Sequence, residues 1–164
     1  MATFSFDIVS QYDKAEMNNV FMQTQREIEN RFDFKGTPAA LDWLGDKIGF
    51  KITGASEWQI DAILDIIRKK LATRNQSSKS LDLTKPITES NLQATKEVPF
   101  KEGLDQEKAK KITKLLKETF PKVKTQIQGD AVRVSSSSKD ELQAVMRTLT
   151  EQDFDFAISF INYR

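Results

Sequence analysis

The sequence predicts an α+β fold built from two α/β sandwich domains, each an antiparallel sheet with helices on one face. Short segments that alternate polar and apolar residues, typical of half-buried strands, are interspersed with longer segments in which apolar residues recur at the helical period. In the second half of the chain the order is strand, helix, strand, strand, helix, strand. This is the order of ferredoxin-like and RNA-recognition folds, and the first half repeats it loosely.

The first half begins with a predicted strand at 5–9, which we assign to the sheet of the C-terminal half. Two helices follow capping boxes that start at Asp13 and Ser56, where an N-cap oxygen is answered by a carboxylate or amide three residues later. Between the helices the alternation predicts a three-stranded meander, at 31–35, 40–44 and 47–53.

Residues 84–96 are polar, contain a proline and show no periodicity, so we interpret them as a linker. A strand is predicted at 97–101, followed by a helix that Asp105 caps. A tight hairpin at 123–135, a helix capped by Ser138 and a last strand at 154–161 complete the chain. The predicted domains are therefore 1–11 together with 97–164, and 12–83, joined by the linker 84–96.

The composition argues against several classes of protein. With no cysteine and no histidine, the chain lacks disulfides, thiol nucleophiles, the commonest metal ligand and the commonest general acid or base. We therefore expect no enzymatic activity and no cofactor. No apolar run approaches the roughly 18 residues of a membrane span, and the N-terminus lacks the features of a signal peptide. A cytoplasmic protein without membrane contact is expected.

A first candidate site lies in the segment Arg31 to Lys35. If it is a strand, Phe32 and Phe34 share a buried face, while Arg31, Asp33 and Lys35 share the exposed one. Arg31 and Lys35 then clamp a phosphate, and Asp33 orients Arg31 or accepts a guanine N–H. The alternative is a solvated sheet face with weak cross-strand ion pairs.

A second candidate site lies in the C-terminal hairpin. Here Ile127, Val132 and Val134 are expected to face the core. The outward face then carries cations and carboxamides, namely Lys124, Gln126, Gln128 and Arg133. Glutamine amides at alternate positions of what we take as a central strand have low strand propensity, and they offer both a donor and an acceptor to a base edge. The alternative is a hydrogen-bonded interface between the two domains.

Several of these segments resemble the YajQ family of bacterial nucleotide-binding proteins. They occur in order over nearly the whole chain, as SFDIVS at 5–10, NRFDFKG at 30–36, SLD at 80–82, KEGL at 101–104, KVKTQIQGDAVRV at 122–134 and FINYR at 160–164. The resemblance implies two ferredoxin-like domains, no known catalytic activity, and binding of nucleotide or RNA. In some members it implies cyclic di-GMP sensing coupled to a transcriptional regulator.

From the residues and the resemblance together, we expect a non-enzymatic nucleotide-binding protein. Cyclic di-GMP or another purine nucleotide such as GTP or ATP is the expected ligand, RNA or tRNA is a further candidate, and a transcriptional regulator is the expected partner. The alternative is an RNA-binding or protein-interaction adaptor without a small-molecule ligand. The net charge of +1 gives no global electrostatic argument for nucleic acid.

Overall fold

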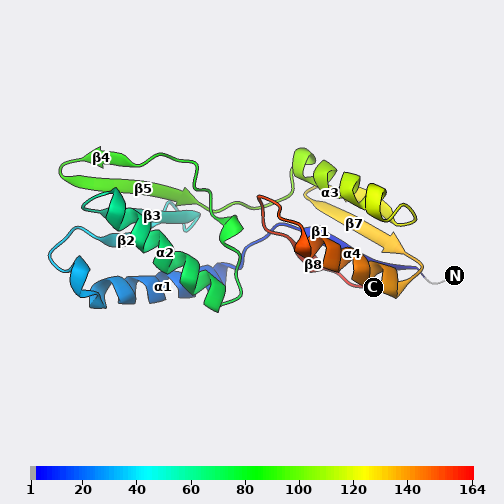
Figure 1. The fold of residues 1–164 in the computed structure, drawn as a ribbon, viewed down its shortest axis with the longest axis horizontal. Coiled ribbons are helices and arrows are strands. Elements are labelled where there is room, and N and C mark those ends of the chain that lie inside the picture. Colours follow the sequence, from blue (N-terminus) through cyan, green and yellow to red (C-terminus); the bar gives the residue numbers. More distant parts are fainter. Residues whose placement is uncertain (1–2) are drawn as a thin grey trace. The chain divides into compact units, whose positions relative to one another are not determined.

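The computed structural model describes residues 3–164 and divides into two compact units. The split unit comprises Met1–Gln11 and Glu102–Arg164, and the inserted unit comprises Tyr12–Lys101. The chain thus leaves the split unit after its first strand, builds the whole inserted unit, and then returns (Figure 1).

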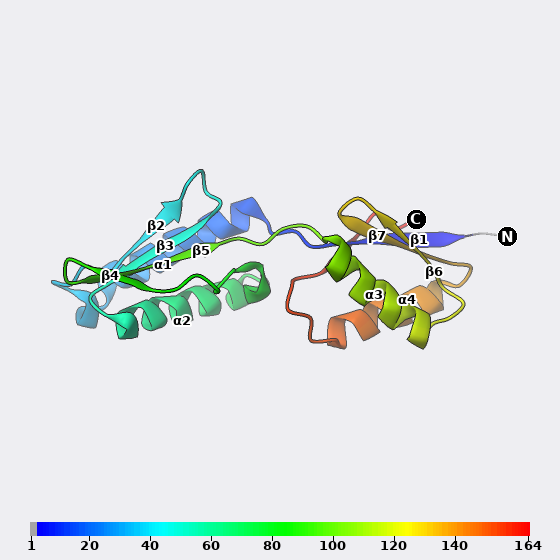
Figure 2. The same ribbon diagram turned by 90° about the horizontal axis from the view of Figure 1, so that it is seen from above.

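The split unit is a four-stranded antiparallel sheet with two helices on one face. Its elements are β1 (Phe4–Val9), α3 (Gln106–Thr119), β6 (Lys124–Gln128), β7 (Ala131–Ser136), α4 (Lys139–Glu151) and β8 (Ser159–Ile161). The strand order is β6-β7-β1-β8, the ferredoxin-like arrangement. Both helices lie on the same side of the strands (Figure 2).

The core of the split unit lies between the sheet and these helices. Phe6 of β1 is opposite Val134 of β7 in the register, and both side chains are fully buried against α3 and α4. The caps match the sequence analysis: the Asp105 carboxylate accepts from the Lys108 backbone N–H at 2.8 Å, and the Ser138 hydroxyl accepts from that of Glu141 at 3.2 Å.

The inserted unit has the same architecture with one strand moved in the sequence. Its elements are α1 (Lys14–Asn30), β2 (Ala40–Leu44), β3 (Gly49–Gly54), α2 (Glu57–Thr73), β4 (Thr88–Ser90) and β5 (Gln93–Pro99), with short 3₁₀ turns at Phe32–Phe34 and Ser78–Ser80. The strand order is β2-β3-β5-β4. The last strand, β5, takes the position that the first strand, β1, has in the split unit. The chain therefore contains two ferredoxin-like α+β units, one of them circularly permuted.

The segment 84–96 is not a linker. It contains β4 and the start of β5, which pair with each other through a tight turn. Asn91 and Leu92 at this turn both have positive φ, 53° and 64°, as in the two-residue turns that match the twist of a hairpin. The three residues of β4 are exposed, so the strand has no apolar face and no periodicity to reveal it.

The strand predicted at 97–101 was assigned to the C-terminal domain, but it lies in the inserted unit. Residues 94–99 pair with β3 of the inserted unit, and the boundary between the units falls at Lys101 and Glu102. β1, in contrast, pairs with β7 and β8 of the C-terminal half, where the sequence analysis assigned it.

The prediction of a strand at 31–35 is wrong. α1 ends at Asn30, and the next residues form the 3₁₀ turn Phe32–Phe34, in which the carbonyl oxygens of Arg31 and Phe32 accept from the backbone N–H groups of Phe34 and Lys35 at 3.2 and 3.3 Å. As a result, Phe34 is buried but Phe32 is 87% exposed. The meander would have paired this segment with β2, but β2 is an edge strand, and the third strand of the sheet, β5, pairs with β3 instead.

The last strand is shorter than expected, because β8 covers only Ser159–Ile161. Phe154 and Phe156 before it lie in an irregular segment, stacked on each other at 5.0 Å between ring centroids, with Phe156 buried in the core. Among residues 3–164, no helix has the length and apolar character required to span a membrane.

Candidate functional site

The helix-free face of the split unit, here called the open face, gathers most of the predicted site residues. Because the side chains of Phe6, Ile8, Val132 and Val134 point to the helices, the residues between them point the other way. Extended through the register of the sheet, the open-face positions are Lys124, Gln126, Gln128, Ala131, Arg133, Ser135, Ser5, Asp7, Val9, Ser159 and Ile161.

An ion pair between the two central strands lies in the middle of this face. Arg133 of β7 donates from Nε to Oδ1 of Asp7 on β1 at 2.9 Å, and a longer contact of 3.5 Å joins Nη2 to Oδ2. The two residues are direct partners in the register. The Asp7 side chain is only 10% exposed and that of Arg133 is 30% exposed, so the guanidinium retains access to ligands.

The Asp7 carboxylate has a second donor. Asn162, immediately after β8, donates from Nδ2 to Asp7 Oδ2 at 2.8 Å. The hydrogen bond from Arg133, followed by that from Asn162, holds the pKa of Asp7 below its ordinary value, and burial opposes them more weakly. Asp7 therefore stays ionised at neutral pH and fixes the orientation of Arg133.

A backbone irregularity places Asn162 there. Asp7 is opposite Ile161, yet two residues earlier Ser5 exchanges backbone hydrogen bonds with Arg164, at 3.0 and 3.3 Å. The C-terminal strand thus has one extra residue, a β-bulge, and Asn162 within it has φ of 57°. Asparagine is among the few residues that tolerate this conformation readily.

The glutamines of β6 flank the ion pair. Gln126 is opposite Arg133 in the register, and both Gln126 and Gln128 are exposed. β6 is an edge strand, not the central strand that we expected. In the described part of the chain neither amide has a hydrogen-bond partner, so both are available to a ligand. Lys124, also exposed, lies two residues before Gln126 on the same face.

The edge position has a consequence for Ile127, which was expected in the core. Its side chain is on the helix side of the sheet but remains 41% exposed, because no strand or helix among residues 3–164 covers the outer edge of β6 there. Val132 and Val134, on the inner strand β7, are fully buried as predicted.

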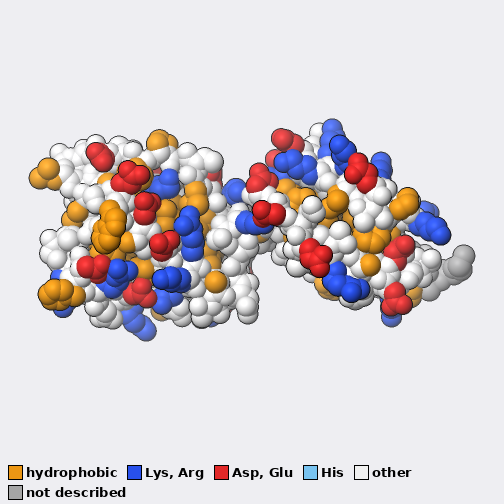
Figure 3. All heavy atoms as spheres, viewed as in Figure 1, with side chains coloured by type: hydrophobic (Ala, Val, Ile, Leu, Met, Phe, Trp, Pro, Cys, Tyr) orange, Lys and Arg blue, Asp and Glu red, His pale blue; other side chains and the backbone are white. Residues whose placement is uncertain are grey.

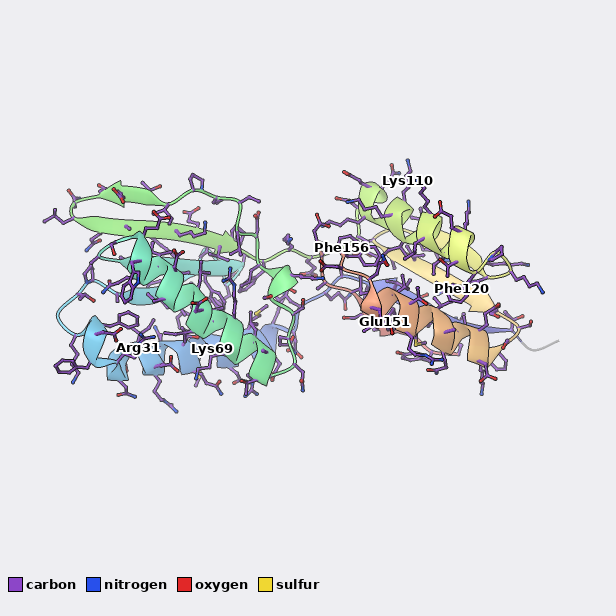
Figure 4. All side chains as sticks on the ribbon, viewed as in Figure 1. Arg31, Lys69, Lys110, Phe120, Glu151 and Phe156 are labelled. Carbon is purple, nitrogen blue, oxygen red and sulfur yellow. The ribbon has the colours of Figure 1, made fainter. Side chains whose placement is uncertain are left out.

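The other predicted residues, Arg31, Asp33 and Lys35, lie in the inserted unit. The Arg31 guanidinium binds the Asp33 carboxylate through two hydrogen bonds, of 3.0 and 2.8 Å, and lies 4.5 Å from the ring centroid of Phe34. This contact lowers the pKa of Asp33 and raises that of Arg31. The three residues therefore lie on the turn after α1, where Figure 4 labels Arg31, and not on a sheet face.

The lysines of α3 are separate from the open face. Figure 3 shows Lys and Arg side chains along this helix with acidic side chains among them, and Figure 4 shows Lys110 pointing away from the sheet. Since α3 covers the opposite side of the sheet, its exposed lysines do not add charge to the open face. Within residues 3–164 there is no group of three or more His, Cys, Asp or Glu residues arranged to hold a metal ion.

Asp7 and Asn162 are the site residues that sequence reasoning missed. They come from the two ends of the chain, 155 positions apart, and only the strand pairing brings them together. Both occur in segments that carried the family resemblance, but the sequence offered no sign that the two segments are neighbours.

Comparison with known proteins gives a consistent result. A family model described as "Nucleotide-binding protein YajQ-like" matches residues 4–164. A protein of Nocardioides sp. is 47% identical over 165 residues, and one of Streptomyces griseus is 48% identical over 168 residues, each alignment covering 100% of both chains. A protein of Trichodesmium erythraeum is 45% identical over 99% of each chain, and all three are named "Nucleotide-binding protein". The match over nearly the whole chain establishes that this protein belongs to the YajQ-like family.

Proposed function

We propose that this protein binds a purine nucleotide on the open face of the split unit and does not turn it over. The observation that carries the proposal is the guanidinium of Arg133, held in one orientation by Asp7 and flanked by the exposed amide of Gln126. The names of the relatives, all nucleotide-binding proteins, support the same class of ligand.

The chemistry of these groups suits a guanine nucleotide. Only part of the hydrogen-bonding capacity of Arg133 is used by Asp7, and the remaining N–H groups can donate to phosphate oxygens or to guanine O6 and N7. Gln126 and Gln128 each present a donor and an acceptor to a base edge. Lys124 adds a positive charge for phosphate. Cyclic di-GMP, which carries two guanines and two phosphates, offers acceptors for all four side chains.

The turn at Arg31–Lys35 is proposed as a further anion contact on the inserted unit. Asp33 neutralises Arg31 there, so Lys35 is the cation that we expect to contribute most. Lys35 is exposed and makes no ion pair within the described residues.

RNA is the second candidate ligand, because helix-free sheet faces of this architecture are used to bind single-stranded RNA. The open-face positions carry no aromatic side chain, however. Base stacking, which dominates such recognition, has no platform among them. RNA would have to bind mainly through phosphate contacts, with steep salt dependence, and this favours the nucleotide over RNA.

We further propose that nucleotide binding is relayed to a transcriptional regulator, as the family resemblance implies. The relay requires that the ligand has different affinity for the free and regulator-bound forms. It predicts that the dissociation constant of a protein–regulator complex changes when the nucleotide is added.

Isothermal titration calorimetry tests the binding proposal. Cyclic di-GMP, GTP, ATP and a short single-stranded RNA are titrated separately at two salt concentrations, and the recovered nucleotides are checked by chromatography for hydrolysis. We expect saturable binding of a guanine nucleotide, with the nucleotide recovered intact. The absence of binding by every nucleotide contradicts the function, and a hydrolysed product contradicts the lack of turnover.

The double variant Gln126→Ala/Gln128→Ala locates the site. Both side chains are exposed, so their removal leaves the fold intact, and we expect affinity to fall by about tenfold or more, the scale of one or two lost hydrogen bonds. The matched control is Gln106→Ala/Gln143→Ala, which changes exposed glutamines on α3 and α4. If the two double variants bind the nucleotide with equal affinity, the nucleotide site does not lie on the open face.

A further inference from the structure

The inserted unit contains a cavity of about 260 Å³ that the proposed function does not use. It lies where the start of α1 meets β2 and the loop between β2 and β3. Its lining combines aromatic, aliphatic and charged side chains, namely Tyr12, Lys14, Met17, Trp43, Asp46, Lys47 and Ile48.

Trp43 is the central aromatic residue of this cavity. One face of its indole stacks on Phe21, with ring centroids 4.3 Å apart and an interplanar angle of 13°. The Lys47 ammonium also lies over the indole, 5.4 Å from the ring centroid. Since Phe21 occupies one face, we infer that Lys47 lies on the other, and both Trp43 and Lys47 line the cavity. Phe50 also packs beside the indole, with ring centroids 5.5 Å apart and an interplanar angle of 35°. The indole is therefore anchored by two rings of the core, and a flexible side chain lies over it.

Lys47 is a cover that a ligand can displace. The residue is exposed, and its backbone has φ of 58°, a conformation that lysine adopts only at a cost. A single cation–π contact at an exposed site is weak. Stacking of a nucleobase on an aromatic side chain is stronger, so a base competes successfully for the same ring face.

The charges at the rim select an anionic ligand. Lys14 and Lys47 contribute two positive charges against the single carboxylate of Asp46. A quaternary ammonium ligand, which also favours aromatic faces, would meet net repulsion. A phosphate between the two ammonium groups would be attracted, and Asp46 can accept hydrogen bonds from the N1–H and N2–H groups of guanine.

The size of the cavity limits the ligand further. Sites for drug-sized molecules range from about 300 to 1,000 Å³. A cavity of about 260 Å³ lies just below this range, which favours one base with its sugar over the two bases of a cyclic dinucleotide.

We propose that this cavity binds a single guanine mononucleotide, with the base stacked on Trp43 and the phosphate held by Lys14 and Lys47. Lys47 leaves the indole as the base enters and moves to the phosphate. The site belongs to the inserted unit alone and does not depend on the proposed function of the open face.

Tryptophan fluorescence reports on this site directly. The chain has two tryptophans, and Trp58 is 65% exposed, so Trp58→Phe leaves Trp43 as the only indole without disturbing the core. We expect GMP to quench the emission of this variant saturably, guanosine to quench it with lower affinity, and ribose 5-phosphate to leave it unchanged. No saturable quenching by GMP, or equal effects of GMP and ribose 5-phosphate, would overturn the proposal.

Charge reversal at the rim provides the second readout. In the Trp58→Phe background, Lys14→Glu/Lys47→Glu changes two exposed residues, and we expect it to weaken GMP binding by about tenfold or more while guanosine binding changes little. The control Lys110→Glu/Lys114→Glu makes the same change in net charge on α3. If both double variants weaken GMP equally, the effect is not local and the proposed phosphate contact is wrong.

The two proposed sites are distinguished in the same background. Gln126→Ala/Gln128→Ala is expected to leave the quenching by GMP unchanged, because these residues lie in the split unit. If this variant abolishes the quenching, the cavity is not the site and only the open face binds nucleotide. If quenching persists while calorimetry with cyclic di-GMP shows no binding, the open-face proposal fails and the cavity proposal stands.

Discussion

Arg133 on β7 and Asp7 on β1 form an ion pair across the two central strands of the split unit, with Nε and Oδ1 2.9 Å apart. These residues are 126 positions apart in the chain, and the ion pair joins the first strand to the C-terminal hairpin. On the open face it fixes the side chain that is best placed to contact a ligand. This one ion pair therefore contributes both to the stability of the split unit and to the proposed binding of a nucleotide.

The first prediction concerns Asn162, the second hydrogen-bond donor to Asp7. Asn162→Gly keeps a residue suited to φ of 57° but removes the hydrogen bond to Asp7. We expect the free energy of unfolding to fall by about 1 kcal/mol. Asn162→Ala should cost about 1 kcal/mol more, because it adds backbone strain at positive φ. Equal stability of the two variants in urea titrations would argue against the bulge.

The second prediction concerns acid. The folded-state pKa of Asp7 lies below its value in the unfolded chain, which is about 3.9. Its contribution to stability is therefore complete above the unfolded pKa and is lost as the pH falls through the folded one. Asp7→Asn should be less stable than the wild type at neutral pH, and the difference should shrink as the pH falls below about 4. Urea titrations across this range provide the measurement.

Other carboxyl groups contribute to the acid response of the whole protein. The pKa values of Glu16, Asp33, Asp82 and Glu97 are also lowered, chiefly by hydrogen bonds from neighbouring side chains. The comparison must therefore be made between Asp7→Asn and the wild type at each pH. A difference that is constant from neutral to acid pH would contradict the account of Asp7.

The third prediction tests the hairpin that replaces the expected linker. Leu92 has φ of 64°, which strains the backbone of a residue with a Cβ. Its side chain is 96% exposed, so its removal costs little packing. Leu92→Gly should raise the free energy of unfolding by about 0.5–1 kcal/mol, because glycine adopts this conformation without steric cost. Leu92→Ala, which keeps a Cβ at positive φ, should give no comparable gain. If Leu92→Gly lowers the free energy of unfolding, the backbone of this turn does not have positive φ at residue 92.

The fourth prediction tests the turn after α1. Phe34 is 4% exposed and Phe32 is 87% exposed. Phe34→Ala should lower the free energy of unfolding by about 3 kcal/mol through the cavity that it leaves, whereas Phe32→Ala should change it by less than about 0.5 kcal/mol. Similar losses from both variants would instead support the buried strand that the alternation suggested.

The sequence was sufficient where one residue pattern had one structural explanation. The helices capped by Asp13, Asp105 and Ser138 form as predicted, since the caps and the apolar period agree. The hairpin of β6 and β7 has the predicted strands, and Gln126 and Arg133 share a face as expected. Local chemistry and alternation determine these features.

The failures have two causes: some segments carry a misleading pattern or none, and the pairing of distant strands is not visible in the residues near either one. The alternation at Arg31–Lys35 arises in a turn that Asp33 and the end of α1 stabilise. β4 is exposed and carries no pattern. Nothing near Gln126 showed that it lies on an edge strand, and nothing near Arg133 pointed to Asp7 as its partner.

The most direct test of the central claim is two-dimensional NMR of isotope-labelled protein during a titration with cyclic di-GMP. The signals to follow are the Nε–H of Arg133, the side-chain amides of Gln126 and Gln128, and the indole N–H of Trp58 as a reference in the other unit. Saturable shifts of the Arg133 and glutamine signals at a common dissociation constant are the predicted result. If these signals stay in place while cyclic di-GMP shifts others, or if no signal moves, the open face is not the nucleotide site.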